Sequence, residues 1–380
     1  MFRKDLQVKL EIIVRILVIF ATSNPESHME LKERIEAFIS LGKFLSQFST
    51  KGIQQKENIP HNELFFDAFK MQIKRAKEYN GWFTEDNVLF SLESWGKALT
   101  EENLLTWTKP YKFDSNPSKN VVVIMAGNIP LVGFHDFLSV LISGHSLIAK
   151  LSSNDKYFIP LVAKYLEYVA PKFKGSISFT EDKLEGFDAV IATGSDNTSR
   201  YFDYYFGKHP HIIRKNRNTV AVLDGNETDT QLEKMSDDIF RYFGLGCRSI
   251  SKLFLPKGYD LDKIFKAVFK HKDIVNYERY ANNYEYNKAV YLMSLFDIRE
   301  NGFLMLKEDE SYASPISSLF YEYYDDIDGL KEKLAKDTDK IQCITSEIEM
   351  PNAIALGATQ TPNLWEYADG VDTLQFLLTI

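Results

Sequence analysis

From residue 118 onward, short apolar runs alternate with segments of helical periodicity. The runs 121–125 and 146–151 are typical of buried strands, and a turn and a helical pattern follow each of them. Strands that alternate with helices in this way form βαβ units, which place the strands in a parallel sheet. The order therefore predicts an α/β fold, with four more strands that extend the sheet at 176–179, 188–192, 211–214 and 219–223.

Helix signals accompany these strands. Pro130 is placed to begin a helix that ends at Gly144, and Asn154 or Asp155 is placed to cap the next helix, which ends at Pro171. Residues 29–107 carry helical periodicity with no sign of paired strands, so they predict a helical region that precedes the sheet.

A second α/β unit follows a helix predicted at 229–242. Its predicted strands are 252–255, 289–293, 318–323 and 342–345, and its predicted helices are 261–271 and 329–336. The last 30 residues are expected to wrap back as loops and a terminal strand. These patterns predict four parts: an extension outside the fold (1–28), a helical and dinucleotide-binding domain (29–228), a catalytic domain (229–350) and a returning C-terminal segment (351–380).

Charge and composition exclude several classes of protein. The 45 basic and 53 acidic side chains give a net charge of −8, which disfavours nucleic acid as a partner. Two cysteines and seven histidines without ligand spacing predict neither a disulfide framework nor a metal site, and they favour a reducing cytoplasm. Glu11 and Arg15 interrupt the apolar stretch 10–21, so it matches neither a signal peptide nor a membrane span.

Two cysteines are candidates for chemistry, and only one has a suggestive context. Cys247 lies in a Gly-x-Gly-Cys turn between a predicted helix and a predicted strand, where backbone N–H groups can surround a bound oxygen near a nucleophilic thiol. The alternative is an ordinary buried cysteine, which is the expectation for Cys343 within the apolar run 341–344.

Three strand ends offer possible ligand contacts. Gly194-Ser195 opens a helix where N–H groups meet phosphates, but it is also a common cap, and no Gly-x-Gly-x-x-Gly motif is present. Asn128 is either an oxyanion donor or a turn residue, and Lys150 either contacts a ligand or extends to solvent. The basic stretch 208–217 either binds phosphates or is a solvated face.

In order along the chain, these segments resemble landmarks of the aldehyde dehydrogenase superfamily, and specifically its acyl-CoA reductase branch, known from the fatty-acid reductase of bacterial bioluminescence. The segments are Met-Ala-Gly-Asn-Ile-Pro (125–130), Ala-Lys-Leu-Ser-Ser (149–153), Ala-Thr-Gly-Ser (192–195), Gly-Cys-Arg-Ser (246–249) and Tyr-Ala-Asp-Gly-Val-Asp (367–372). The resemblance covers residue 118 to the C-terminus and implies a Rossmann-type cofactor domain plus a second α/β catalytic domain.

The resemblance also implies roles for individual residues. Cys247 corresponds to the catalytic cysteine and Asn128 to the asparagine of the oxyanion hole. The expected cofactor contacts are Lys150, Ser152, Gly194 and Ser195. Relatives of this type commonly associate, which implies a homo-oligomer.

Departures from the superfamily pattern refine the expected reaction. Arg214 begins the segment that replaces Glu-Leu-Gly-Gly-Lys, so the glutamate that activates water for thioester hydrolysis is missing. Ser153 replaces an acidic residue that often holds the ribose in NAD-preferring members, which favours NADPH and leaves NADH possible. Glu310 lies in a poorly matched segment and has no assigned role.

The combined expectation is NADPH-dependent reduction of an acyl-CoA, with a fatty acyl group favoured, to the aldehyde through a cysteine thioester. Reduction of another activated acyl group such as an acyl phosphate would use the same thiol. A cysteine acyltransferase or thioesterase would form the thioester without hydride transfer, and a non-catalytic relative would keep only the fold.

Overall fold

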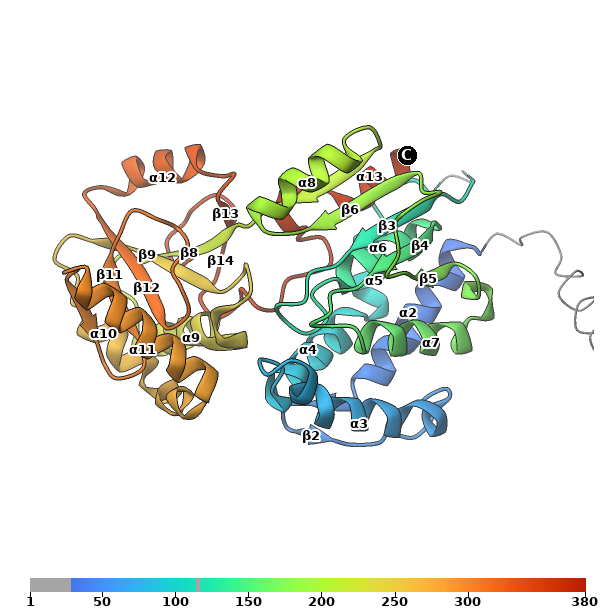
Figure 1. The fold of residues 1–380 in the computed structure, drawn as a ribbon, viewed down its shortest axis with the longest axis horizontal. Helices are drawn as coiled ribbons and strands as arrows, with labels where there is room; N and C mark the ends of the chain where they lie inside the picture. The colour runs from blue at the N-terminus through green and yellow to red at the C-terminus, as the bar shows by residue number, and fades with distance from the viewer. Residues whose placement is uncertain (1–28, 114–116) are drawn as a thin grey trace, which may run out of the picture.

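The computed structural model describes residues 29–113 and 117–380 of the chain. It contains two large sheets that lie side by side, each with helices packed against it (Figure 1). One sheet has five strands in the order β5-β4-β3-β6-β7. The other has seven, in the order β10-β11-β12-β9-β8-β13-β14. The expectation for residues 1–28 falls outside the described residues.

The five-stranded sheet is parallel throughout and confirms the predicted βαβ order. Its strands are β3 (Asn120–Ile124), β4 (Ser146–Lys150), β5 (Ile177–Phe179), β6 (Ala189–Thr193) and β7 (His211–Arg214). Strand β3 lies between β4 and β6, and Val121, Val122 and Val123 are almost fully buried. Helices cover both faces, so the central strands read as continuous apolar runs.

The helices of this unit depart from the predicted starts. Helix α6 (Phe134–Ser143) ends at Gly144, which has a positive φ of 92°, but it begins after Pro130 because the 131–133 turn intervenes. Helix α7 (Phe158–Val169) has no side-chain cap from Asn154 or Asp155. The buried Asp155 instead accepts a hydrogen bond from the backbone N–H of Leu131, so the predicted cap is wrong.

The remaining helices of this unit are α8 (Asp196–Phe206) and the lead-in helices α2 (Leu31–Leu45), α3 (Asn62–Tyr79), α4 (Glu85–Ala98) and α5 (Glu101–Thr108). The lead-in region also contains the short antiparallel pair β1 (Phe48–Ser49) and β2 (Gly52–Ile53), which the helical pattern did not predict. The lead-in helices share one apolar core with α6 and α7, so they form part of the same unit as the five-stranded sheet.

The seven-stranded sheet begins one strand earlier than the pattern predicts. Strand β8 (Asn218–Val222) pairs with β9 (Ile250–Pro256) and with β13 (Ile341–Ser346), not with β7. The expectation that residues 219–223 extend the first sheet is therefore wrong. The chain passes from one sheet to the other at 215–217, and we propose this linker as the domain boundary in place of residue 228.

One predicted strand of the second unit is helical. Residues 289–293 are the last turns of α11 (Glu278–Met293), in which Tyr280, Tyr284, Asn287 and Tyr291 form the buried face. The apolar side chains of Leu292 and Met293 are exposed, so this run is not a buried strand.

The other elements of this unit are β10 (Ile298–Glu300), β11 (Met305–Glu308), β12 (Ser318–Tyr324), β14 (Ala353–Ile354), α9 (Asp229–Phe240), α10 (Asp262–Val268), η3 (Phe269–Asn276) and α12 (Ile327–Lys336). Strands β9, β12 and β13 confirm three predicted strands. The edge strands β10 and β14, and β11 next to β10, were not predicted from the sequence.

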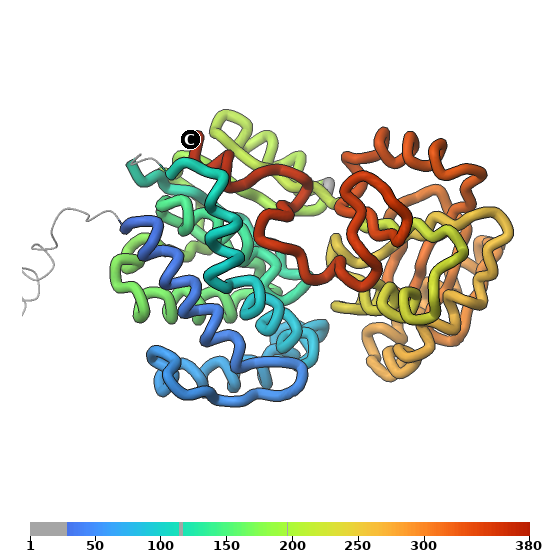
Figure 2. The backbone as a smooth tube through the Cα atoms, turned by 180° about the vertical axis from the view of Figure 1, so that it is seen from behind, coloured from blue at the N-terminus to red at the C-terminus, as the bar shows by residue number. Residues whose placement is uncertain are grey.

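The C-terminal segment leaves the seven-stranded unit and crosses to the five-stranded unit, where the red tube of Figure 2 lies across both. It ends in helix α13 (Thr373–Thr379), so the expected terminal strand is wrong although the return of the segment is confirmed. Leu374 and Leu377 of α13 are fully buried in the core of the five-stranded unit. His145 Nε2 donates to the Leu377 carbonyl oxygen at 2.7 Å, which fixes the end of the helix.

Among the described residues, none of the helices has the length and apolar character needed to cross a membrane.

Candidate active site

Residues predicted to bind a cofactor gather at one edge of the five-stranded sheet. Parallel strands end at the same edge, and β3 has β4 and β6 as its neighbours. Asn128 follows β3, Lys150 ends β4 with Ser152 close behind, and Gly194-Ser195 follows β6. The fold therefore brings all three predicted segments together, at the edge where α/β sheets commonly bind ligands.

The turn after β3 lies very close to the turn after β4. A Cβ atom built on Gly127 would come within 2.5 Å of Ser152 Oγ and 2.6 Å of Ser152 Cβ. Any other residue at position 127 would therefore force Ser152 to move. Asn80 Nδ2 donates weakly to the carbonyl oxygens of both turns, Gly127 at 3.4 Å and Asn154 at 3.3 Å, and so ties the lead-in helices to this edge.

Polar donors line the same edge. Ser195 is the N-cap of α8, and its hydroxyl accepts from the Thr198 N–H at 3.4 Å, at the end where the helix dipole favours an anion. Lys150 Nζ donates to the carbonyl oxygens of Glu181 and Asp182 at 3.3 and 3.1 Å. An ammonium group, two hydroxyl groups and a helix N-terminus are the donors that a nicotinamide dinucleotide uses, so the residues present fit such a cofactor.

The cysteine loop connects η2 (Arg241–Gly244) to β9 and meets this edge from the other sheet. Asn128 Nδ2 donates to the Leu245 carbonyl oxygen at 2.7 Å, two residues before Cys247. Tyr242 and Phe243 both adopt positive φ values, 56° and 58°, a costly conformation for these residue types that is often found at functional sites. The structure therefore brings both predicted catalytic residues, Asn128 and Cys247, into one site.

Thr219 of β8 contacts the cysteine loop through its side-chain hydroxyl. Its Oγ1 donates to the Cys247 carbonyl oxygen at 2.9 Å and lies 3.0 Å from Cys343 Sγ, whose thiol can donate to it. Cys343 is half-buried on β13 and lies next to the cysteine loop, so it is not the fully buried core residue that the sequence indicates.

Surrounding protein atoms raise the pKa of the Cys247 thiol to about 11, although the residue itself is exposed to solvent. Arg248 and Arg214 lower this pKa, while Asp369 and Cys343 raise it. These are the charged and titratable groups that act on the thiol, and they come from the cysteine loop, β7, the C-terminal segment and β13 respectively.

Arg214 has a structural position that neither reading of the basic stretch anticipates. It is buried, and its Nη2 donates to Asp136 Oδ1 at 2.6 Å and to Thr373 Oγ1 at 2.9 Å, while Nη1 donates to the Ala368 carbonyl oxygen at 2.9 Å. Burial alone would lower its pKa, but the Asp136 carboxylate outweighs burial and raises it. Arg214 therefore fastens the C-terminal segment to the five-stranded unit.

The C-terminal segment also contacts the cysteine loop directly. Arg248 Nη2 donates to the Glu366 carbonyl oxygen at 3.2 Å, and Gln360 Nε2 donates to the Arg248 carbonyl oxygen at 2.8 Å. Asp369 has a φ of 60°, and its Oδ1 lies 3.6 Å from Arg217 Nε. Burial raises the pKa of Asp369, while Arg214 and Arg217 oppose that rise.

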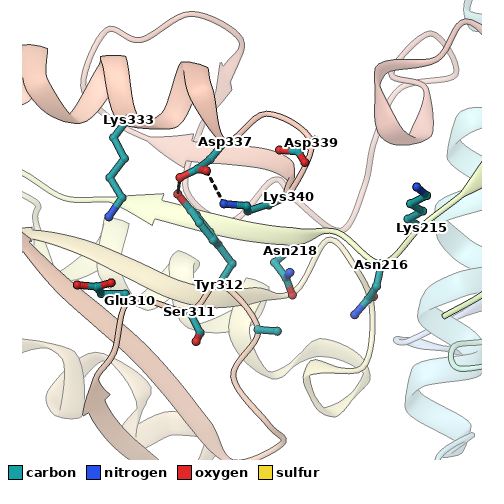
Figure 3. A pocket seen from close by; sticks show the side chains of 11 residues that line it. Lys215, Asn216, Asn218, Glu310, Ser311, Tyr312, Lys333, Asp337, Asp339 and Lys340 are labelled. Carbon is teal, nitrogen blue, oxygen red and sulfur yellow. Dashed lines mark hydrogen bonds and ion pairs between the residues drawn. The ribbon is translucent and has the colours of Figure 1, made fainter. Parts of the chain in front are cut away.

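A cavity of about 640 Å³ lies in the seven-stranded unit beside the linker between the two sheets (Figure 3). Within it, Asp337 accepts hydrogen bonds from the Tyr312 hydroxyl and from Lys340 Nζ. Glu310, which had no assigned role, is at its wall. The lining residues are Lys215, Asn216, Asn218, Glu310, Ser311, Tyr312, Ala313, Lys333, Asp337, Asp339 and Lys340. Because Asn218 precedes Thr219, the cavity borders the strand that supports the cysteine loop.

No group of three or more His, Cys, Asp or Glu side chains within residues 29–113 and 117–380 is placed to hold a metal ion.

A comparison with known protein families shows to which family the chain belongs. The family model described as "Acyl-CoA reductase (LuxC)" matches residues 47–282, more than half of the sequence. The chain belongs to the LuxC acyl-CoA reductase family. It is thus an oxidoreductase of the acyl-CoA reductase type, concerned with reduction between the acyl and aldehyde levels. A search of curated proteins found no match.

Solved structures with the same fold are aldehyde dehydrogenases. Indole-3-acetaldehyde dehydrogenase AldA of P. syringae, in complex with NAD+, is 12% identical with a TM-score of 0.59, over 84% of this chain and 72% of that one. An aldehyde dehydrogenase of Mycobacterium tuberculosis, complexed with NAD+, is 14% identical with a TM-score of 0.58, over 87% and 80%. This likeness confirms the predicted aldehyde dehydrogenase fold of the LuxC family member.

Sequence reasoning did not assign roles to three residues that contact or influence the cysteine loop. Arg248 and Asp369 lie inside the quoted segments 246–249 and 367–372, so the signal that identified Cys247 also contained them. Thr219 has no motif around it, and its contact with Cys247 follows from the pairing of β8 with its neighbours.

Proposed function

We propose that this LuxC family member reduces an acyl-CoA thioester to the aldehyde, with NADPH as reductant and Cys247 as the acyl acceptor. The observation that carries the proposal is the hydrogen bond from Asn128 to the Leu245 carbonyl oxygen. It joins the residue proposed for the oxyanion hole to the loop of the proposed nucleophile, although the two belong to different sheets.

In the first half-reaction, the Cys247 thiolate attacks the carbonyl carbon of the substrate and a new carbon–sulfur bond forms. Asn128 and backbone N–H groups of the loop stabilise the tetrahedral oxyanion. The bond to coenzyme A then breaks, and its thiolate leaves and takes up a proton. The acyl group remains as a thioester on Cys247.

For the second half-reaction, a nicotinamide cofactor held at the edge of the five-stranded sheet would supply the hydride, and with it the two electrons, that reduce the acyl thioester on Cys247. The product on Cys247 is a thiohemiacetal, whose collapse breaks the carbon–sulfur bond, releases the aldehyde and returns the thiol. Lys150, Ser152, Gly194 and Ser195 are the residues we propose to hold the cofactor.

The charge at position 214 supports reduction over hydrolysis. Arg214 cannot act as a general base, because its guanidinium is always protonated and is bound to Asp136. An acyl enzyme without a base for water is preserved for hydride transfer. A fatty acyl group is our proposed substrate, and a homo-oligomer in the cytoplasm, where the thiol stays reduced, is our proposed working form.

Oxidation of NADPH by the purified protein, measured by nicotinamide absorbance with a short-chain and a long-chain acyl-CoA, tests the proposal. We expect oxidation that requires both the acyl-CoA and Cys247, with the Cys247→Ala variant inactive but still able to bind nucleotide. Parallel assays with NADH and with an acyl phosphate establish the cofactor and the leaving group. Release of free coenzyme A without oxidation of either nucleotide would favour an acyltransferase or thioesterase.

A further inference from the structure

The arginines that lower the pKa of Cys247 differ in whether a carboxylate neutralises them. Arg214 is paired with Asp136. Arg248 forms no ion pair with any residue in the described part of the chain, and the Glu366 carboxylate beside it accepts from Asn363 instead. Arg248 is therefore the uncompensated positive charge at the nucleophile.

The guanidinium of Arg248 is held in place by one of its terminal nitrogens, and the other nitrogen has no hydrogen-bond partner among the described residues. Its Nη2 donates to the Glu366 carbonyl oxygen at 3.2 Å, and its own carbonyl oxygen accepts from Gln360, so both ends of the residue are anchored to the C-terminal segment. Its Nη1 is shielded from solvent and has no hydrogen-bond partner among the described residues. A buried cationic donor without a partner is costly, and a thiolate in the neighbouring residue would offset that cost.

The chemistry of the site requires a source of thiolate. The thiolate, not the thiol, is the nucleophile, and nearby cations are a common means of stabilising it. The segment that replaces the superfamily glutamate supplies Arg214 rather than a base. The charges that remain near the thiol are Arg248 from its own loop, Arg214 from the end of β7 and Asp369 from the C-terminal segment, with Cys343 as a further titratable group from β13.

We infer that Arg248 is a positioning residue that activates Cys247 through its charge. The C-terminal segment sets the position of that charge, because the Glu366 carbonyl oxygen accepts a hydrogen bond from Arg248 Nη2. This inference rests on the proposed function, because the reactivity of Cys247 matters to the reaction only if this thiol accepts the acyl group.

The test measures the thiol itself and needs no substrate. In a Cys343→Ser background, the rate of alkylation of Cys247 by iodoacetamide is followed from neutral to alkaline pH, with mass spectrometry to confirm the modified residue. Arg248→Gln removes the charge and keeps a donor for the Glu366 carbonyl, and Arg248→Lys keeps the charge.

We expect Arg248→Gln to lower the alkylation rate at neutral pH by about tenfold and to move the midpoint of the pH profile upward. Arg248→Lys should stay close to the parent profile. Thermal unfolding monitored by circular dichroism identifies variants that do not fold, and Arg248→Met replaces Arg248→Gln if the latter does not.

An unchanged midpoint in a folded variant without the Arg248 charge would overturn the inference, as would equal losses in Arg248→Gln and Arg248→Lys. The proposed function and the role of Arg248 can be refuted independently of each other. Shifted midpoints without any acyl-CoA reduction would refute the proposed function alone, whereas Cys247-dependent reduction with unshifted midpoints would refute only the role of Arg248.

Discussion

Asn128 and Leu245 are joined by a hydrogen bond of 2.7 Å, in which the side-chain amide of one sheet's turn donates to the backbone of the other sheet's cysteine loop. The bond joins the two units two residues before Cys247. It therefore links the proposed oxyanion donor to the loop that carries the proposed nucleophile.

Replacing Asn128 by Ala should remove both this bond and the amide that stabilises the oxyanion. We expect the acylation rate with acyl-CoA to fall by about 100-fold, the usual cost of losing one such donor, with little change in nucleotide affinity. Rapid-mixing measurement of coenzyme A release gives the rate. Asn276→Ala, at an exposed position away from the loop, should match the parent, and an unimpaired Asn128→Ala would exclude a role in acylation.

Thr219→Val should leave the Cys247 carbonyl oxygen without its hydroxyl donor. Because Thr219 is fully buried, we expect a loss of about 1–2 kcal/mol in the free energy of unfolding, measured by urea denaturation. Thr219→Ser keeps the hydroxyl and removes a methyl group. A larger loss for Thr219→Ser than for Thr219→Val would show that packing, not the hydrogen bond, holds the loop.

Asp155 should make stability depend on pH. Burial raises its pKa from 3.8 to about 7, so the folded state holds a proton that the unfolded state lacks between these two values. Folding takes up that proton, so the free energy of unfolding falls as the pH rises through this window. Asp238, with a pKa raised to about 6 by burial, acts in the same direction.

Asp155→Asn removes one of these two groups. Between about pH 5 and about pH 8, the parent should lose on the order of 3 kcal/mol more stability than the variant, with Asp238 contributing to both. Urea denaturation at several pH values measures the difference. Parallel curves for the two proteins would show that the Asp155 carboxyl does not titrate in this range.

Leu374→Ala should destabilise the whole five-stranded unit, since the Leu374 side chain is fully buried between α13 and the rest of the core. A large-to-small change at such a site costs about 2–5 kcal/mol. Gln375→Ala changes the adjacent exposed position and should cost little. Equal thermal stabilities of the two variants would mean that α13 does not contribute to the core.

The sequence predicted the five-stranded sheet well because its central strands are buried on both faces and read as continuous apolar runs. The same reasoning failed at 289–293, where Val290, Leu292 and Met293 suggested a strand. The spacing of Tyr280, Tyr284, Asn287 and Tyr291 indicates a helix face and was the better signal. The sheet to which β8 belongs was not predictable, because a strand's own residues do not identify its partners.

In the candidate site, too, some features could be predicted from local sequence segments and others could not. Cys247 and Asn128 were predicted from short segments in a shared order, and the fold joins Asn128 to Leu245, two residues before Cys247. The role of Asp155 was misassigned because a polar residue before a helix usually caps it, whereas this one accepts a hydrogen bond from the Leu131 N–H, which follows the neighbouring strand β3. Arg214 pairs with Asp136 and the C-terminal segment, contacts between distant residues that no local pattern shows.

The anchoring of residues 357–377 has a consequence for biosynthesis. A ribosome releases the polypeptide from its N-terminus, and N-terminal parts generally fold first. Arg214, Arg248 and His145 would all have emerged while their acceptors on the C-terminal segment were still untranslated. The loop of Cys247 in a nascent chain therefore lacks these contacts until residues 357–377 have been synthesised and have docked.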